Sequence, residues 1–264
     1  MSRNVDFLIV GAGIVGLTIA RELKIRDPNS RILVLEKEVS AGLHSSGRNS
    51  GVLHSGIYYP AGSLKAKVCR QGAIEMAEYH LANKLRLDRR GKILVVAKDE
   101  DSSQLDVLAE RAIRNGVSVE HLDEQSLRRL EPEVRSANGR ALLIPSTSVG
   151  SPSDVMKVLV DEIVTMGITL QTGTSMVEAK PDRQFVRLNT GEAISFGHLV
   201  NAAGLHADSV AHKFGAGRQY TLLPFKGIYW ELIPDSGIRV KHLIYPAPDL
   251  RVPFLGVHTT TTTD

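Results

Sequence analysis

Three glycines and one glutamate near the start of the chain have the types and spacing of a phosphate-binding turn. Gly11, Gly13 and Gly16 form a G-x-G-x-x-G pattern, and Glu36 follows 20 residues after the last of them. The first glycine allows a tight turn, the second lets a pyrophosphate approach the backbone, and the third lets a helix pack closely on a strand. A carboxylate at position 36 can accept hydrogen bonds from both ribose hydroxyls. The pattern therefore predicts dinucleotide binding.

The elements needed to position this motif are present around it. Phe7–Val10 is a short apolar run typical of a buried parallel strand. Apolar residues then recur at helical spacing from Ile14 to Leu23, and the turn residues 27–30 end the helix. A second apolar strand, "RILVLE", ends at Glu36. A glycine triplet alone often serves only packing, but a strand, a helix and an acid in register favour the dinucleotide site, without separating NAD from FAD.

The segment 44–60 bears on the choice of cofactor. A nicotinamide enzyme would normally continue from Glu36 into another strand and helix, whereas glycine and serine are too frequent here for a regular helix. Small residues let backbone approach a flat ring, which suits a cofactor that extends beyond its pyrophosphate. The alternative is a solvated loop, and apolar Val52, Leu53 and Ile57 count against it because they indicate partial burial. The polar side chains expected to contact phosphate or ring edges are those of Ser45, Ser46, Asn49 and Ser50.

Composition excludes several classes of protein. The 264 residues are 42% hydrophobic with a formal net charge of +3, so we expect a globular protein without a nucleic-acid-binding patch. Cys69 is the only cysteine and cannot form an internal disulfide, which fits a reducing compartment. The N-terminus enters a strand at once and no apolar run is long enough to cross a bilayer, so we expect a cytoplasmic protein with at most peripheral contact with the inner membrane. We expect no metal site.

The remaining chain alternates between helical and strand patterns. Helices are expected over 64–81, 102–115, 123–131 and 151–166, the last with Pro152 at its start and Gly167 at its end. The segments expected to form strands are "GKILVVA", "VSVEHL", "ITLQTG", the start of "HLVNAAGLHAD", "YTLLPFKGIYWELI" and "RVKHLIY".

The order of these motifs resembles one known family. Glu36-Lys37, "SGRNSGVLHSGIYY", "GSLKAKVCRQG", "IPSTSVGSPSDV", "LVNAAGLHAD", "PFKGIYWEL", "HLIYPAPD" and "PFLGVH" together resemble the L-2-hydroxyglutarate dehydrogenase/oxidase family, within the D-amino-acid oxidase superfamily of FAD enzymes. Members of that family continue past the point where this chain ends in "HTTTTTD", and they supply a final strand and helix beside the flavin. The resemblance implies that this chain is an N-terminal fragment.

The resemblance implies a noncovalently bound FAD, with its adenine end at Glu36 and its flavin ring near 49–56. Cys69 is interpreted as an ordinary buried residue rather than a covalent attachment point. Gly204 would permit close approach to the cofactor after the strand that precedes it, whereas Ala202 and Ala203 are explained equally well by packing. The expected cofactor-binding residues are Gly11, Gly13, Gly16, Glu36, Lys37, Ser46, Asn49, Ser50, Gly51 and Gly204.

Oxidation of a 2-hydroxy acid requires hydride transfer from C2, a base for the hydroxyl proton, and cations for the carboxylates. Histidine suits the base because its pKa is near neutrality. Among nine histidines, only His54 and His258 lie in segments that resemble the family's active-site face. The alternatives are a structural hydrogen bond for His54 and a frayed chain end for His258.

Lys226 in "PFKGIYW" is the first candidate for the carboxylate-binding cation, at a position where relatives often carry arginine. Arg48 is the second candidate, and either residue may be read instead as an ordinary surface charge. Tyr58 and Tyr59 are candidates to donate a hydrogen bond to the substrate, although one of them could simply pack against the flavin. Some relatives place an arginine shortly after the residue that matches His258, whereas positions 259–263 of this chain are all threonine.

The predicted fold is α/β. A Rossmann-like FAD-binding domain, residues 1–84 and 150–217, is interleaved with an α+β substrate domain, residues 85–149 and 218–264, whose C-terminal part is missing. The predicted function is FAD-dependent oxidation of L-2-hydroxyglutarate to 2-oxoglutarate, with electrons passed to a quinone or to oxygen. The alternatives are another superfamily enzyme acting on an amino acid or glycerol 3-phosphate, and an inactive flavin-binding fragment.

Overall fold

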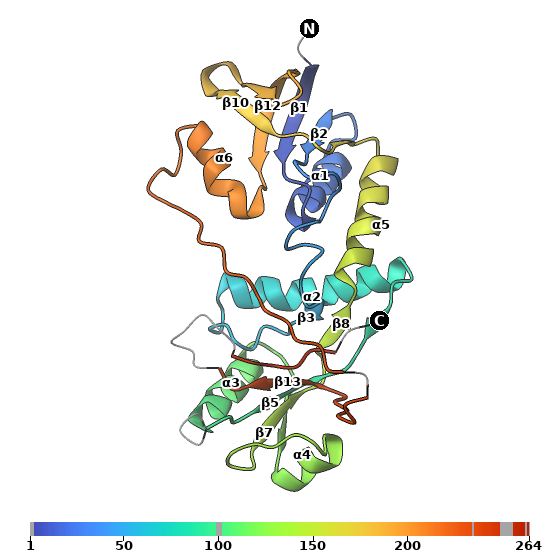
Figure 1. The fold of residues 1–264 in the computed structure, drawn as a ribbon, viewed down its shortest axis with the longest axis vertical. Helices are drawn as coiled ribbons and strands as arrows, with labels where there is room; N and C mark the ends of the chain where they lie inside the picture. The colour runs from blue at the N-terminus through green and yellow to red at the C-terminus, as the bar shows by residue number, and fades with distance from the viewer. Residues whose placement is uncertain (1–2, 99–101, 234, 249–255, 262, 264) are drawn as a thin grey trace. The chain divides into compact units, whose positions relative to one another are not determined.

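Two compact units, each built from two separate stretches of the chain, make up the structure. Unit 1 contains residues 1–49 and 152–229, and unit 2 contains residues 50–151 and 230–264. The computed structural model describes residues 3–98, 102–233, 235–248, 256–261 and 263 (Figure 1). Compactness does not test which stretch binds a flavin and which a substrate, so the domain assignment made from the sequence remains a prediction.

Unit 1 is organised around a six-stranded sheet in the order β10-β11-β12-β1-β2-β9. Its central strand β1 is parallel to β12 on one side and to β2 on the other, and β2 is parallel to β9. An antiparallel pair, β10 and β11, completes the sheet beside β12. The strands are β1 Arg3–Val10, β2 Ile32–Leu35, β9 Thr169–Gln171, β10 Met176–Lys180, β11 Phe185–Leu188 and β12 Ala193–Asn201.

Helices cover both faces of this sheet because its central strands are apolar on both sides. Ile9 and Val34 face the core formed with α1 Ile14–Arg26 and α5 Pro152–Thr165. Leu8 and Leu33, one residue earlier along each strand, face the opposite core, which includes Val210 of α6 Ala207–Lys213. Figure 1 shows α1 and α5 together, with α6 separate from them. The resulting strand, turn, helix and strand at the N-terminus confirm the order predicted from the sequence.

Unit 2 contains two smaller sheets. The four-stranded sheet has the order β13-β5-β7-β6, with β13 parallel to β5 and the other pairs antiparallel. The three-stranded sheet has the order β3-β8-β4, and both of its pairs are antiparallel. The strands are β3 Val52–Leu53, β4 Leu87–Asp88, β5 Lys92–Val95, β6 Glu120–Leu122, β7 Ala141–Ile144, β8 Ser148–Gly150 and β13 Leu243–Pro246.

Three helices accompany these sheets. They are α2 Leu64–Ala82, α3 Ser102–Arg114 and α4 Glu124–Leu130. The helix α2 begins where Ser63 accepts a hydrogen bond from the Ala66 amide, and α4 begins where Asp123 accepts one from the Ser126 amide. These starts and lengths confirm the helices predicted from the sequence. Two 3-10 turns, η2 Pro181–Arg183 and η3 Gly204–His206, complete the elements of the described chain.

The strand predicted over "YTLLPFKGIYWELI" is wrong. The structure describes no strand in residues 220–233, and their large apolar side chains are exposed, including Phe225 at 76% and Trp230 at 92%. Of the two segments expected to form strands after residue 217, only the second does, as β13. In the final stretch, Thr259 forms an antiparallel bridge with Ile244. Residues 253–255, 262 and 264 of "PFLGVHTTTTTD" lie outside the described residues.

Candidate functional site

At two of the three glycine positions in the turn of unit 1, only a residue without a Cβ fits. Gly11 has φ +107°, and a Cβ there would lie 2.4 Å from the carbonyl oxygen of Ala202. A Cβ on Gly16 would lie 2.0 Å from the carbonyl oxygen of Gly11, so α1 packs directly on the turn. At Gly13 a Cβ would lie 2.9 Å from Ser46 Oγ. The contacts at Gly11 and Gly16 fit the tight turn and the close helix packing expected there, and the pyrophosphate role of Gly13 stays a prediction.

Glu36, the residue after β2, lies against this turn. Its Oε2 accepts a hydrogen bond from the Ala12 amide at 2.9 Å, and its Oε1 accepts one from the Glu38 amide at 2.9 Å. Both bonds fix the carboxylate at the carboxyl ends of β1 and β2, where open parallel sheets bind their ligands. Each oxygen retains a second lone pair for a ligand hydroxyl. The position is therefore suited to the ribose contact predicted for Glu36.

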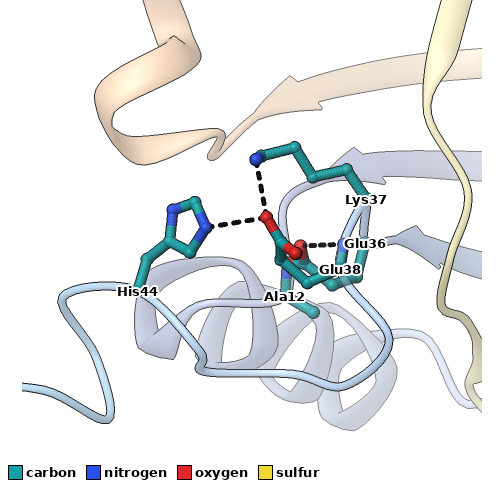
Figure 2. Close-up of polar contacts among 5 residues, drawn as sticks. All are labelled: Ala12, Glu36, Lys37, Glu38 and His44. Atoms are coloured by element: carbon teal, nitrogen blue, oxygen red, sulfur yellow. Dashed lines mark hydrogen bonds and ion pairs between the residues drawn. The ribbon is translucent and has the colours of Figure 1, made fainter.

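A surface ion-pair group lies next to Glu36 in unit 1 (Figure 2). Lys37 Nζ donates to Glu38 Oε1 at 2.7 Å, and His44 Nε2 lies 2.9 Å from the same oxygen. The hydrogen bond from Lys37, followed by that from His44, lowers the pKa of the Glu38 carboxyl. The Lys37 ammonium thus contacts a carboxylate of its own chain, and its predicted cofactor role stays a prediction.

The loop after Ala41 caps the first turn of α1. Ser46 Oγ accepts a hydrogen bond from the Ile14 amide at 2.9 Å, close to Gly13. Asn49 Nδ2 donates to the carbonyl oxygens of Ser45 and Ser46, which holds the loop in its turn. The loop predicted to contact the cofactor therefore lies at the start of the helix that follows the glycine turn.

The remaining predicted cofactor residues are Ser50, Gly51 and Gly204, and their roles stay predictions. Gly204 has φ +54° with no atom within 4 Å of a Cβ position, and Gly51 has φ +69°. Ser50 is partly buried. Ser50 and Gly51 belong to unit 2, whereas Gly204 belongs to unit 1.

A second group of chemistry-bearing side chains lies in unit 2. The rings of His54 and Tyr58 are 6.3 Å apart, and the His54 ring lies 6.1 Å from that of Tyr245. The His258 ring lies 4.1 Å from Tyr245, and Lys92 Nζ lies 4.3 Å from the Tyr58 centroid. The structure thus brings together His54, Tyr58 and His258, three residues selected from the sequence.

Burial gives this group unusual electrostatics. Desolvation, followed by the nearby Lys92 and His258, lowers the pKa of His54 to about 4. Desolvation also lowers the pKa of Lys92 to about 7 and raises that of the Tyr58 phenol. At neutral pH, His54 is therefore a neutral imidazole that can accept a proton, and Tyr58 is a neutral hydrogen-bond donor.

Two predicted cations are not part of this group. Lys226 and Arg48 are exposed and belong to unit 1. Tyr59 belongs to unit 2, where the ammonium of Lys65 lies 5.1 Å above its ring. The group instead contains Lys92 and Tyr245, which the sequence analysis missed. Lys92 begins the otherwise apolar run "KILVV", and a lysine at the start of a strand is usually exposed, so nothing in the sequence marked it as buried.

The comparison with known families concerns nearly the whole chain. Residues 6–264 match the family described as FAD dependent oxidoreductase. This chain belongs to that family. The oxidoreductase is 35% identical to an L-2-hydroxyglutarate dehydrogenase of Salmonella houtenae over 257 residues, which is 97% of this chain and 60% of that protein. It is 36% identical over 273 residues to the mitochondrial L-2-hydroxyglutarate dehydrogenase of Homo sapiens, covering 98% of this chain and 58% of that one. The chain thus spans about three fifths of the length of these relatives.

Solved structures show the same fold for this FAD-dependent oxidoreductase. L-α-glycerophosphate oxidase from Mycoplasma pneumoniae, solved with FAD bound, superposes with a TM-score of 0.77 at 22% identity over 93% of this chain and 66% of that one. Glycine oxidase from Geobacillus kaustophilus gives a TM-score of 0.73 at 21% identity over 81% and 59% of the two chains. These likenesses confirm the predicted α/β fold class.

The residues of unit 1 fit FAD, the cofactor of this family. The glycine turn leads into the start of α1, which contributes the positive end of a helix dipole, and the Glu36 carboxylate is fixed beside that turn. Within the described residues, no helix is long and apolar enough to span a membrane. The same residues contain no group of three or more histidine, cysteine or acidic side chains placed to hold a metal ion.

Proposed function

We propose that this oxidoreductase binds FAD at the glycine turn and oxidises L-2-hydroxyglutarate to 2-oxoglutarate. The observation that carries the proposal is the 35% identity to L-2-hydroxyglutarate dehydrogenases over 97% of the chain. The buried group of unit 2 supports it, since it combines a neutral histidine, a phenol and an ammonium. These are the proton acceptor, hydrogen-bond donor and cation that a 2-hydroxy acid requires.

Each residue has a defined part in the proposed reaction. FAD, when bound, supplies the acceptor for the hydride that leaves C2. Gly11 and Gly16 form the tight turn and the close helix packing, Gly13 lets the pyrophosphate approach the backbone, and Glu36 holds the adenosine ribose. His54 takes the hydroxyl proton at Nδ1, a buried atom without a hydrogen-bond partner in the described residues. Loss of that proton and of the hydride converts the C2 alcohol to a ketone, and the electrons then pass to a quinone or to oxygen.

Flavin absorbance tests the proposal directly. The purified chain with FAD is placed under anaerobic conditions and L-2-hydroxyglutarate is added. Bleaching of the flavin band by this isomer supports the proposed function, provided that D-2-hydroxyglutarate, glycine and glycerol 3-phosphate do not bleach it. Bound flavin that remains oxidised with L-2-hydroxyglutarate, or is bleached better by glycine or glycerol 3-phosphate, would contradict the proposed substrate. Readmission of oxygen or addition of a soluble quinone then identifies the acceptor by the rate of reoxidation.

A further inference from the structure

Lys92 occupies a core position in the four-stranded sheet of unit 2. Successive residues of a strand point to opposite faces, and Leu94 and Val96 lie in the core formed with α3, whereas Ile93 and Val95 lie in the other core. Lys92 shares the face of Leu94 and is 0% exposed. A lysine is almost never fully buried unless it is paired. This position therefore requires an explanation.

The ammonium of Lys92 has aromatic neighbours but no hydrogen-bond acceptor among the described residues. Its Nζ lies 4.3 Å from the Tyr58 centroid and 5.4 Å from the Tyr245 centroid, and no side chain or carbonyl oxygen in the described chain accepts its protons. Cation–π contacts offset part of the desolvation but leave the donors unused. Buried polar groups in native proteins are nearly always hydrogen-bonded. The Lys92 ammonium is an exception, which indicates a partner that the described residues do not supply.

Other buried polar atoms of unit 2 share this property. His54 Nδ1, the Tyr58 hydroxyl and Ser55 Oγ are buried without hydrogen-bond partners in the described residues. All three belong to the segment that follows β3, and Tyr58 packs against the same core as Leu94. Lys92 Nζ and the Tyr58 hydroxyl can donate hydrogen bonds, and His54 Nδ1 can accept one, so a ligand that combines carboxylate oxygens with a hydroxyl would satisfy all three.

The ionisable side chains that face Lys92 are neutral or positively charged. They are His54 and Tyr58 from the segment after β3, Cys69 from α2, Tyr245 from β13, and His258 next to Tyr245. No ion pair joins Lys92 to a carboxylate in the part of the chain that the structure describes. An anion would therefore complement this group, and a carboxylate would supply two oxygens for an ammonium and a phenol.

We propose that Lys92 is the cation that binds one carboxylate of the substrate, with the Tyr58 hydroxyl as its hydrogen-bonding neighbour. The proposal rests on the proposed function, and it replaces the exposed Lys226 and Arg48 in that role. It also places the carboxylate charge beside His54. Such a charge raises the proton affinity of His54 only when substrate is bound, which prepares the imidazole to take the hydroxyl proton.

The test uses glutarate, a dicarboxylate that lacks the hydroxyl and cannot be oxidised. Glutarate binding to the FAD-supplied chain is measured by calorimetry for the wild type, Lys92→Met and Lys65→Met. The control is matched because Lys65 also places its ammonium over a tyrosine ring but is exposed. We expect Lys92→Met to weaken glutarate binding by about 30-fold or more and Lys65→Met to leave it within about twofold, since loss of one partner of a buried charge pair removes most of the affinity.

A second readout reports on Lys92 itself. In protein labelled with ¹³C at the lysine ε-carbon, the resonance absent from Lys92→Met is that of Lys92, and glutarate should raise its pKa. A weaker glutarate affinity in Lys92→Met without a rise in the pKa of Lys92 in the wild type would contradict direct contact between the Lys92 ammonium and the carboxylate. Failure of the wild type to bind glutarate, or unchanged affinity in folded Lys92→Met, would also overturn the proposal.

The outcomes for Lys92 and for the proposed function are separable. Flavin bleaching by L-2-hydroxyglutarate combined with Lys92-independent glutarate binding would retain the proposed function and reject Lys92. Lys92-dependent glutarate binding without any bleaching would retain the carboxylate site and reject the proposed substrate. Thermal unfolding of each variant, followed by circular dichroism, establishes that the chain under test is folded.

Discussion

The Glu36 carboxylate accepts a hydrogen bond from the Ala12 amide at 2.9 Å, which ties the end of β2 to the glycine turn after β1. The same carboxylate accepts a bond from the Glu38 amide and so also shapes the chain that leaves β2. A single side chain thus connects the glycine turn with the chain that leaves β2. Its removal should affect FAD binding more than the fold.

Glu36→Ala should lower FAD affinity by about 10- to 100-fold, because hydrogen bonds to a charged group contribute about 1.5–3 kcal/mol each. Quenching of flavin fluorescence during titration measures the dissociation constant. Glu22→Ala is the matched control, since Glu22 lies on α1 and, among the described residues, forms an ion pair only with the exposed Arg26. Equal FAD affinities for the two variants would remove Glu36 from the cofactor site.

Gly16→Ala should destabilise unit 1 and prevent FAD binding. The new Cβ would lie 2.0 Å from the Gly11 carbonyl oxygen, and a backbone atom cannot move away without opening the turn. Overpacking of this kind costs about 1–3 kcal/mol or more. Gly72→Ala is the control in another helix, where no atom lies within 4 Å and alanine should stabilise by about 0.4–1 kcal/mol. Urea unfolding compares the two, and equal stability would contradict the tight contact at Gly16.

Glu131→Ala should destabilise unit 2 by about 2–4 kcal/mol, because it leaves buried donors unpaired. Glu131 is 0% exposed, and its Oε1 accepts hydrogen bonds from the Lys241 amide, the His242 amide and the His242 ring. This carboxylate holds the segment before β13 against the end of α4. Exposed Glu133 provides the control, and Glu133→Ala should change the unfolding free energy by less than about 0.5 kcal/mol. If Glu131→Ala lowered the unfolding free energy by no more than Glu133→Ala does, the hydrogen bonds to Glu131 would not be needed for stability.

Lys92 should make the stability of the protein depend on pH in the alkaline range. Its pKa is lowered to about 7 in the folded chain from an ordinary value near 10.5, so the folded state binds fewer protons than the unfolded state between these values. The wild type should therefore gain stability as the pH rises from 7 to 10, by up to about 1.4 kcal/mol per pH unit. Lys92→Met should be more stable than the wild type at pH 7, and this advantage should shrink across the same window. If the difference in unfolding free energy between the wild type and Lys92→Met did not change with pH, Lys92 would not be buried as an unpaired amine.

His54→Ala should slow anaerobic flavin reduction by L-2-hydroxyglutarate by about 100- to 10,000-fold, the usual contribution of a general base. Stopped-flow absorbance gives the rate, and His121→Ala at an exposed position serves as the control. His258→Ala, measured alongside, separates the two histidine candidates. Unchanged reduction in His54→Ala would exclude His54 as the base and leave His258 to be tested in that role.

The helices and the glycine turn could be predicted because their signals are local. The pattern that follows Gly11 contains the turn, the helix spacing and the terminal acid within one stretch of chain, and α1 begins and ends as that pattern predicts. The helix α2 was predicted over 64–81 and is found over 64–82. By contrast, the strand predicted over 220–233 depended on partner strands that the sequence of this segment does not specify.

The buried group of unit 2 could be predicted only in part. His54, Tyr58 and His258 were selected from motifs, but their proximity depends on the pairing of β13 with β5 and on the bridge from Ile244 to Thr259. Lys92 was missed because a lysine at the start of a strand is usually exposed. Lys92 differs from an ordinary exposed lysine only because it shares a strand face with Leu94, and the sequence does not reveal that α3 packs on this face.

The segment 220–233 has a consequence for how the protein behaves in solution. Its exposed aromatic and aliphatic side chains are of types that favour β-strands, yet its backbone groups pair with no strand among the described residues. Lys226 and Glu231 are its only charged residues, and Pro224 interrupts only its first half. Segments of this composition recruit one another edge to edge, and charges or prolines within them act as gatekeepers. We therefore expect this exposed segment to favour association between chains, and we expect Lys226, Glu231 and Pro224 to oppose it.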